Sequence, residues 1–327
     1  MAESCQSKIG DPLVSMLMII VSFRRSRTLF GGLVRVVIAG FGRAGRQHAE
    51  AIGHVENVRV QAVLESDGGV DTAPHVRASS WADVLADPDV DAVALCLPPG
   101  GRVELAAAAL DAGKSVLLEK PPCMSTAELD RLSAMSGKVG VMLQHRFRLP
   151  VAVLERPFKE AAGSLLVSRP RDALTHYSGW RGDSGKALGG ITAHLGVHYL
   201  DLACQVLGEV ESVHIGNYRE CAPGIDLRVG GIVQFTSGSS LSFTVAADVP
   251  ARAEHLVIAG DGRRLTVEDG AVTYREDDRS EEHPAAPTGA MRAQVYAEFA
   301  RRPDLCSLER SRPVLAVLDA VRNAGTR

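Results

Sequence analysis

The sequence predicts an α/β protein of two domains, the first built on a parallel sheet and the second on an open, mostly antiparallel sheet. Three observations support this fold class. The chain has 327 residues, enough for two domains that each bury a core. Its 46% apolar and 23% charged residues are typical of globular proteins, which excludes a disordered or coiled-coil chain. Strand and helix patterns alternate up to about residue 150, after which strand patterns follow one another directly.

Charge and cysteine content exclude several functional classes. The formal net charge is -3 and aromatic residues make up only 5% of the chain, so we expect neither a nucleic-acid nor a membrane partner. The six cysteines are scattered and form no C-x-x-C pair. This pattern predicts no metal site and fits the reducing cytoplasm.

The first residues of the chain are expected to lie outside the fold. The apolar run 13–23 is shorter than the about 20 residues that span a bilayer. Its basic cluster, Arg24, Arg25 and Arg27, follows the run, whereas a secretory signal carries the charge in front. We therefore divide the chain into an N-terminal extension (1–32), a first domain (33–150) and a second domain (151–327).

The first domain alternates strands and helices. Val34–Ala39 is an apolar run broken only by Arg35, as in a buried parallel strand. Gly113 closes an alanine-rich helix, and Ser125 or Thr126 caps the next one. The predicted strands are Val34–Ala39, Val58–Leu64, 91–97, Ser115–Leu118 and 140–143, with a short one near Val76. The predicted helices are 45–52, 81–85, 103–112 and 126–135.

The second domain has a different pattern. One long helix is predicted over 191–207, ended by Gly208. Alternating apolar residues between Val213 and Tyr274 then predict successive antiparallel strands. The acidic run 276–282 is expected to be a solvated loop. Two helices, 291–300 and 313–322, are expected to finish the chain.

A glycine-rich motif follows the first strand and opens a helix, as a dinucleotide site requires. It consists of Gly40, Phe41, Gly42, Arg43, Ala44 and Gly45. Gly40 permits a tight turn, Gly42 lets the backbone approach a pyrophosphate, and Gly45 lets the helix pack on the strand. The helix N-terminus favours phosphate charge. The motif predicts a Rossmann dinucleotide-binding domain, with a bare glycine-rich turn as the alternative.

Glu65 ends the second strand, 20 residues after Gly45. An acidic side chain at this place accepts hydrogen bonds from the adenosine ribose and repels a 2′-phosphate, so NAD is favoured over NADP. Arg43 complicates this preference if it reaches a phosphate. An exposed glutamate at a strand end is the alternative interpretation.

Two further groups of residues predict catalysis. Glu119-Lys120-Pro121 follows the strand Ser115–Leu118, at the carboxyl edge where parallel sheets bind ligands. A lysine there can stay charged and donate to a substrate hydroxyl. His194, His198 and Asp201 share one helix face, and either histidine can act as a general base. Hydrogen-bonded core histidines are the alternative, and the absence of an obvious third ligand argues against zinc.

Taken together, GFGRAG, EKP and GGITAHLGVHYLDL (189–202) resemble the glucose-fructose oxidoreductase / inositol dehydrogenase family over about residues 33–325. The resemblance implies a Rossmann domain followed by an α/β domain whose open sheet carries substrate and oligomer contacts. It implies an NAD(P)-dependent oxidoreductase that acts on a hydroxyl or keto carbon of a sugar, polyol or related small molecule. A homo-oligomer, dimer or tetramer, is implied through the C-terminal sheet.

The resemblance also assigns residues by position. Lys120 matches the lysine that orients the reacting hydroxyl, and His198 matches the general acid/base. The cofactor residues beyond the glycine-rich turn and Glu65 are Leu97, Pro98, Glu119 and Lys120. The substrate residues are Lys120, Arg146, Trp180, Arg181, His194 and His198.

Three departures from the family pattern keep other functions open. His194 stands where many members have an aspartate, and Leu97 and Arg102 replace a threonine and a histidine. Only fifteen residues separate Glu65 from Trp81, too few for the usual helix and strand. The alternatives to a dehydrogenase are a redox-neutral glycosidase or lyase that retains NAD, and a non-catalytic nucleotide-sensing regulator.

Overall fold

The structure, a computed structural model, describes residues 32–325. From Val34 onward the chain forms one compact unit. All but the last residue of the expected N-terminal extension lies outside the described residues. Among the described helices none combines the length and apolar character needed to cross a bilayer.

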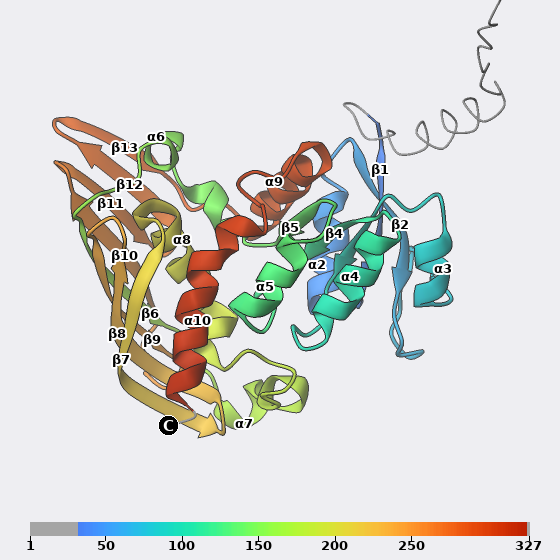
Figure 1. The fold of residues 1–327 in the computed structure, drawn as a ribbon, viewed down its shortest axis with the longest axis horizontal. Coiled ribbons are helices and arrows are strands. Elements are labelled where there is room, and N and C mark those ends of the chain that lie inside the picture. The colour runs from blue at the N-terminus through green and yellow to red at the C-terminus, as the bar shows by residue number, and fades with distance from the viewer. Residues whose placement is uncertain (1–31, 326–327) are drawn as a thin grey trace, which may run out of the picture. The chain divides into compact units, whose positions relative to one another are not determined.

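A five-stranded parallel sheet forms the first half of the fold, as predicted (Figure 1). Its strand order is β2-β1-β3-β4-β5. The order reverses between β1 and β3, which places the ligand crevice at the carboxyl ends of these strands. The predicted strand near Val76 is a single bridge between Val63 and Arg77. The strands are β1 Val34–Ala39, β2 Val58–Leu64, β3 Ala92–Leu95, β4 Ser115–Leu118 and β5 Val139–Val141.

Helices cover this sheet, and one of them comes from the far end of the chain. Val295, Tyr296 and Phe299 of this late helix, α9, share a buried cluster with Val36 and Ile38 of β1. The sequence gives no indication that this helix returns to the first sheet. The helices of this half are α2 Arg43–Ile52, α3 Trp81–Ala86, α4 Arg102–Asp111, α5 Thr126–Ser133 and α9 Thr288–Arg301.

The second half contains an open eight-stranded sheet in the order β13-β12-β11-β10-β6-β9-β8-β7. Every neighbouring pair is antiparallel except β6 and β9, which confirms the predicted mostly antiparallel sheet. The strands are β6 Ala162–Ser168, β7 Val210–Ala222, β8 Ile225–Phe235, β9 Ser240–Ala246, β10 Ala253–Gly260, β11 Arg263–Glu268, β12 Ala271–Glu276 and β13 Arg279–His283.

The acidic run 276–282 forms a hairpin, so the predicted loop is wrong. Strand β13 pairs with β12 from Val272↔His283 to Glu276↔Arg279, and Asp277 adopts a positive φ of 51° in the turn. Strand β13 is exposed along its whole length and shows no apolar alternation. Charged side chains are typical of such edge strands because they discourage pairing with a further chain.

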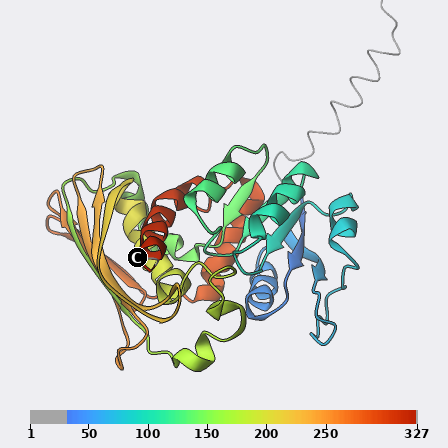
Figure 2. The same ribbon diagram turned by 60° about the horizontal axis from the view of Figure 1, so that its bottom comes forward.

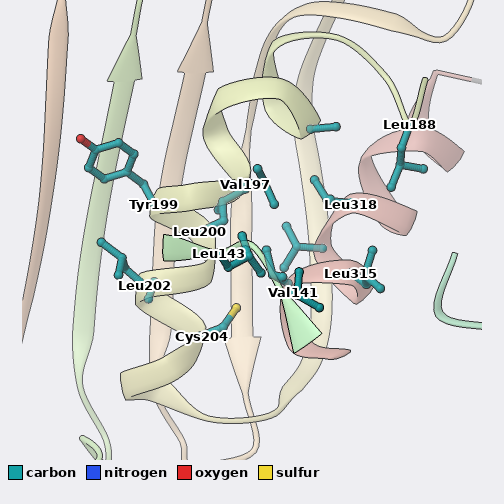
Figure 3. Packing of buried hydrophobic residues seen from close by; sticks show 14 of the residues in the cluster. Val141, Leu143, Leu188, Val197, Tyr199, Leu200, Leu202, Cys204, Leu315 and Leu318 are labelled. Carbon is teal, nitrogen blue, oxygen red and sulfur yellow. The ribbon is translucent and has the colours of Figure 1, made fainter. Parts of the chain in front are cut away.

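Two helices lie on one face of the eight-stranded sheet, α8 (Val197–Leu207) and α10 (Arg312–Ala324) (Figures 1 and 2). In the core between them, Val197 and Leu200 lie near Leu318, and Val141 at the end of β5 joins the same cluster (Figure 3). The predicted helix over 191–207 begins with a π-helical turn, η3 (Thr192–Gly196). The remaining short helices are η1 Gln144–Arg148, α6 Val151–Glu155, α7 Ala173–His176, η2 Gly179–Gly182 and η4 Glu309–Ser311.

Candidate active site

A cavity of about 530 Å³ lies at the carboxyl ends of the parallel strands. It brings together the glycine-rich turn, the turn after β3, the Glu119–Pro121 turn after β4, and the start of α8. The predicted residues that line it are Gly42, Arg43, Ala44, Leu97, Pro98, Glu119, Lys120, Trp180, Arg181, His194 and His198. The cavity thus joins motifs that lie far apart in the sequence.

The glycine-rich turn has the shape that a dinucleotide needs. Gly40 has a φ of +87°, and a Cβ on Gly45 would collide with the carbonyl oxygen of Gly40. Space beside Gly42 is open, and α2 begins there without a side-chain cap. Its first amide groups are therefore available to a phosphate, and the turn fits a nicotinamide dinucleotide.

Glu65 lies next to this turn and is held by backbone amides. Its carboxylate accepts hydrogen bonds from the amides of Phe41 at 2.7 Å and of Asp67 at 3.0 Å. Burial alone would raise the pKa of Glu65, but these hydrogen bonds lower it below the usual value. Glu65 therefore carries a negative charge at neutral pH, and it does not line the cavity itself.

A buried chain of polar groups holds the Glu119–Pro121 turn, and sequence reasoning missed it. The Glu119 carboxylate contacts His48 Nε2 at 3.1 Å and accepts a hydrogen bond from the Lys120 amide at 2.9 Å. His48 Nδ1 lies 2.7 Å from the Tyr296 hydroxyl of α9. Burial opposes ionisation, but the His48 hydrogen bond and the nearby cations lower the pKa of Glu119 to about 2. Glu119 is thus an anion that holds the backbone amide of Lys120.

Arg102 explains one departure from the family pattern. Its buried guanidinium donates to the carbonyl oxygens of Leu97, Glu119 and Pro121, and so ties the turn after β3 to the turn after β4. Burial lowers the pKa of Arg102 to about 10, which leaves it charged at neutral pH. In place of a histidine, this chain has a cationic brace behind the cavity.

Lys120 connects the two halves of the fold. Its ammonium group donates to the backbone carbonyl of His194, in the π-helical turn η3. Burial lowers the pKa of Lys120 to about 8, against the opposing effect of Glu119 and with a contribution from Arg292 and Arg181. Lys120 is therefore mostly protonated at neutral pH yet gives up its proton more easily than an exposed lysine. Single-turn π-helices are frequent at functional sites.

Several histidines line the same cavity. His198 is 6% exposed and its ring stacks on that of His145, with ring centroids 4.2 Å apart. Burial lowers the pKa of His198 well below the usual value, and the nearby His145 and Lys120 add to this effect. Burial and the charge of Lys120 lower the pKa of His194 to about 2. Both His194 and His198 are therefore neutral at neutral pH.

A carboxylate of β8 fixes the start of the π-helical turn η3, which leads into α8. Asp226 accepts hydrogen bonds from the Gly190 amide at 2.6 Å, the Thr192 amide at 2.9 Å and the Thr192 hydroxyl at 2.7 Å. A Cβ on Gly190 would collide with the Asp226 backbone. The two glycines before the helix thus permit close approach of β8, which holds the turn that carries His194.

Arg146 is not in the cavity, although it was expected at the substrate. Its side chain is 0% exposed and makes two hydrogen bonds of 2.8 Å to the Asp201 carboxylate, with a further one to the Ser311 hydroxyl. Asp201, which was expected on the histidine face, is equally buried. The Arg146–Asp201 ion pair joins η1 to α8 inside the core, so its role is structural.

We expect Arg146→Ala to lower the free energy of unfolding by about 3–5 kcal/mol, because it leaves the Asp201 carboxylate buried without its partner. Chemical denaturation followed by circular dichroism measures this loss. The double variant Arg146→Met, Asp201→Leu should be less destabilised than Arg146→Ala. A loss below about 1 kcal/mol for Arg146→Ala would show that the pair does not support the core.

Comparisons with known proteins agree with the fold. Residues 34–147 match the model described as "Oxidoreductase family, NAD-binding Rossmann fold", and residues 161–266 match the "GFO/IDH/MocA C-terminal domain". The fold and site therefore define an oxidoreductase with a nicotinamide-binding Rossmann domain. The two matches together span most of the chain, which belongs to the glucose-fructose oxidoreductase / inositol dehydrogenase (GFO/IDH/MocA) family.

Individual relatives are dehydrogenases. The chain is 28% identical to D-xylose 1-dehydrogenase (NADP(+)) 2 of Haloferax volcanii, over 85% of this chain and 90% of that protein. It is 31% identical to D-glucoside 3-dehydrogenase of Escherichia coli, over 57% of this chain and 58% of that protein. Among solved structures, levoglucosan dehydrogenase in complex with NADH has a TM-score of 0.74 at 18% identity, covering 90% of this chain and 97% of that one. The last comparison supports the fold alone.

Proposed function

We propose that the protein is an NAD-dependent dehydrogenase that oxidises a secondary hydroxyl of a sugar-like or polyol-like molecule, or reduces the corresponding ketone. The observation that carries this proposal is that Lys120 and His198 line the same cavity as the glycine-rich turn. A cation and a neutral base beside a dinucleotide site are the two groups that alcohol oxidation needs. Relatives named as xylose, glucoside and myo-inositol dehydrogenases support the substrate class.

When bound, the nicotinamide ring supplies the acceptor for the hydride. Lys120 is proposed to hold the reacting oxygen by a hydrogen bond and to stabilise the alkoxide character that develops on it. His198, neutral because of its burial, accepts the hydroxyl proton. His194 receives the Lys120 ammonium on its backbone carbonyl, so it positions the lysine as well as lining the site. In the reducing direction the same groups return the proton.

A binding screen followed by a kinetic assay tests this function. Thermal shifts with NAD and NADP measure cofactor binding, and sugars and polyols are then added with the preferred cofactor. The proposal expects a shift with NAD and formation of reduced nicotinamide with at least one hydroxyl compound. Failure of both nicotinamide cofactors to bind would contradict it.

Glu65 is expected to set the preference between NAD and NADP. Removing its carboxylate in Glu65→Ala takes away repulsion against a 2′-phosphate, so the ratio of NADP to NAD affinity should rise by about tenfold. Calorimetric titration of both cofactors measures this ratio. A general change in the turn around Phe41 would weaken the binding of both cofactors and leave the ratio unchanged. The exposed Glu56→Ala serves as the charge-matched control. An unchanged ratio would remove Glu65 from cofactor selection.

We also propose that the outer face of the eight-stranded sheet forms a homo-oligomer, a dimer or tetramer. Leu166 of β6 and Ile232 of β8 are each 43% exposed, and the strand register places both on the same face. Analytical ultracentrifugation of the wild type and of Ile232→Asp tests this arrangement. The cytoplasm remains the predicted compartment.

A further inference from the structure

Cationic side chains dominate the wall of the cavity. Nine lysine and arginine residues line it, against three acidic residues. The chain as a whole has slightly more acidic than basic residues, so this excess is local. A concentration of one charge in a cleft attracts ligands of the opposite charge.

Several of these cations already have a partner. Arg169 and Arg252 pair with Glu254, and Arg148 donates to the backbone carbonyl of Gly270. Arg102 is the brace described above. Of the remaining lining arginines, Arg43, Arg171, Arg181 and Arg292 make no ion pair within residues 32–325.

The four arginines without an ion pair come from two groups of segments. Arg43 belongs to the glycine-rich turn, and Arg292 belongs to α9, which packs beside α2, so both lie on the cofactor side. Arg171 and Arg181 come from the segment that follows β6 and lead toward the histidines. This second group lines the cavity together with Lys120 and His198, where the substrate is expected.

Arg171 and Arg181 line the cavity together with the His176–His194 pair. The centroids of the two histidine rings lie 4.9 Å apart in an edge-to-face contact. Burial lowers the pKa of each ring, and the charges of both arginines add to this effect. Arg181 also stacks on Trp180 at 4.6 Å, which holds its guanidinium in place. The Nε atoms of Arg171 and Arg181 are buried without a hydrogen-bond partner in the described part of the chain. Placing unpaired cations together costs free energy unless an anion compensates for it.

The cavity offers few free carboxylates to a ligand. Glu254 already accepts from Tyr199 and pairs with Arg169, and Glu119 is engaged by His48. Among the described lining carboxylates, only Asp269 makes no side-chain hydrogen bond. A site in which guanidinium groups outnumber free carboxylates favours an oxyanion. Its neutral acceptors, among them Gln144 Oε1, are left for hydroxyl groups of the same molecule.

We propose that Arg171 and Arg181 bind an anionic group of the substrate, a carboxylate or a phosphate, while Lys120 and His198 act on a hydroxyl of the same molecule. The inference rests on the proposed dehydrogenase function and specifies its substrate class as an acidic or phosphorylated hydroxy compound. Guanidinium groups recognise both oxyanions through paired hydrogen bonds.

Anion binding is measured directly, without turnover. Inorganic phosphate and malonate are titrated by calorimetry into the wild-type protein saturated with NAD, at constant ionic strength, and glycerol serves as the neutral probe. We expect saturable binding of at least one anion and none of glycerol. Phosphate binding alone indicates a phosphorylated substrate, and malonate binding alone indicates a carboxylate.

Two single variants, Arg171→Gln and Arg181→Gln, locate the binding. Each should weaken anion binding by about 10- to 100-fold and leave NAD affinity within about twofold. The exposed Arg264→Gln of β11, the charge-matched control, should change neither. Thermal unfolding verifies that each variant is folded, and either variant suffices for the test.

Three outcomes would overturn the proposal. If neither anion binds, the cavity holds no anion site. If binding is the same in the variants as in the wild type, the protein holds an adventitious ion only. If NAD affinity falls together with anion affinity, the arginines bind the cofactor phosphates instead. A failure of the dehydrogenase function has a different signature, because no hydroxy compound then yields reduced nicotinamide, whether or not an anion binds.

Discussion

Replacing Lys120 with alanine is expected to lower kcat by about 10²- to 10³-fold, the usual effect of removing one group that stabilises a developing oxyanion. Lys120 lines the cavity, and its ammonium group donates a hydrogen bond to the carbonyl oxygen of His194. Because we propose that Lys120 acts on the substrate while the glycine-rich turn holds the cofactor, NAD affinity should change by less than about threefold. Steady-state kinetics and calorimetry measure the two quantities.

The pH profile distinguishes this role from a structural one. The pKa of Lys120 is lowered to about 8, so the protonated form is lost as the pH rises through 8. Wild-type kcat for alcohol oxidation should fall on the basic side, and this fall should be absent from the residual activity of Lys120→Ala. The exposed Lys159→Ala is the matched control. Near-normal turnover in Lys120→Ala would remove the lysine from the reaction.

Replacing His198 with asparagine is expected to lower kcat by about 10²- to 10⁴-fold, as the loss of a general base does. His198 is neutral across the physiological range because its pKa is lowered by burial. The kcat of the wild type should therefore not fall as the pH drops through 6.5. The kcat of the variant should increase as the pH rises, because hydroxide then replaces the missing base. Measurement of kcat between pH 6 and 9 tests both statements.

Chemical rescue separates a base from a packing residue. His198 stacks on His145, so its loss also leaves space beside that ring. Added imidazole should restore part of the activity of His198→Ala if the ring accepts the proton. The variant His54→Asn, at an exposed position in the turn after α2, should behave as the wild type. Absence of rescue together with an unchanged pH profile would make His198 a structural residue.

Much of the fold follows from local patterns. The apolar run of Val34–Ala39 and the turn at Gly40 specify a buried strand followed by a helix, and both are observed. The hairpin at the sheet edge could not be predicted in the same way, because Arg279–His283 is exposed on both faces and lacks apolar alternation. The return of α9 to the first sheet depends on contacts between residues far apart in the chain, which no local pattern reveals.

The site is predictable only where one motif carries the chemistry. Lys120 follows a strand end and His198 sits on a helix face, and both line the cavity. Arg146 stands in an equally polar stretch, but its pairing with Asp201 depends on tertiary packing. Arg171, Arg181 and the other lining arginines come from separate segments, so their convergence appears only in three dimensions.

The most direct test of the central assignment is the production of reduced nicotinamide in a reaction that contains the protein, NAD and one hydroxy compound from a set of sugars, polyols, sugar acids and sugar phosphates. The assignment predicts an absorbance increase in the reduced-nicotinamide band that matches the ketone formed, one for one, and that Lys120→Ala nearly abolishes. Cleavage of a glycoside without net reduced nicotinamide, or the same increase in Lys120→Ala, would contradict it.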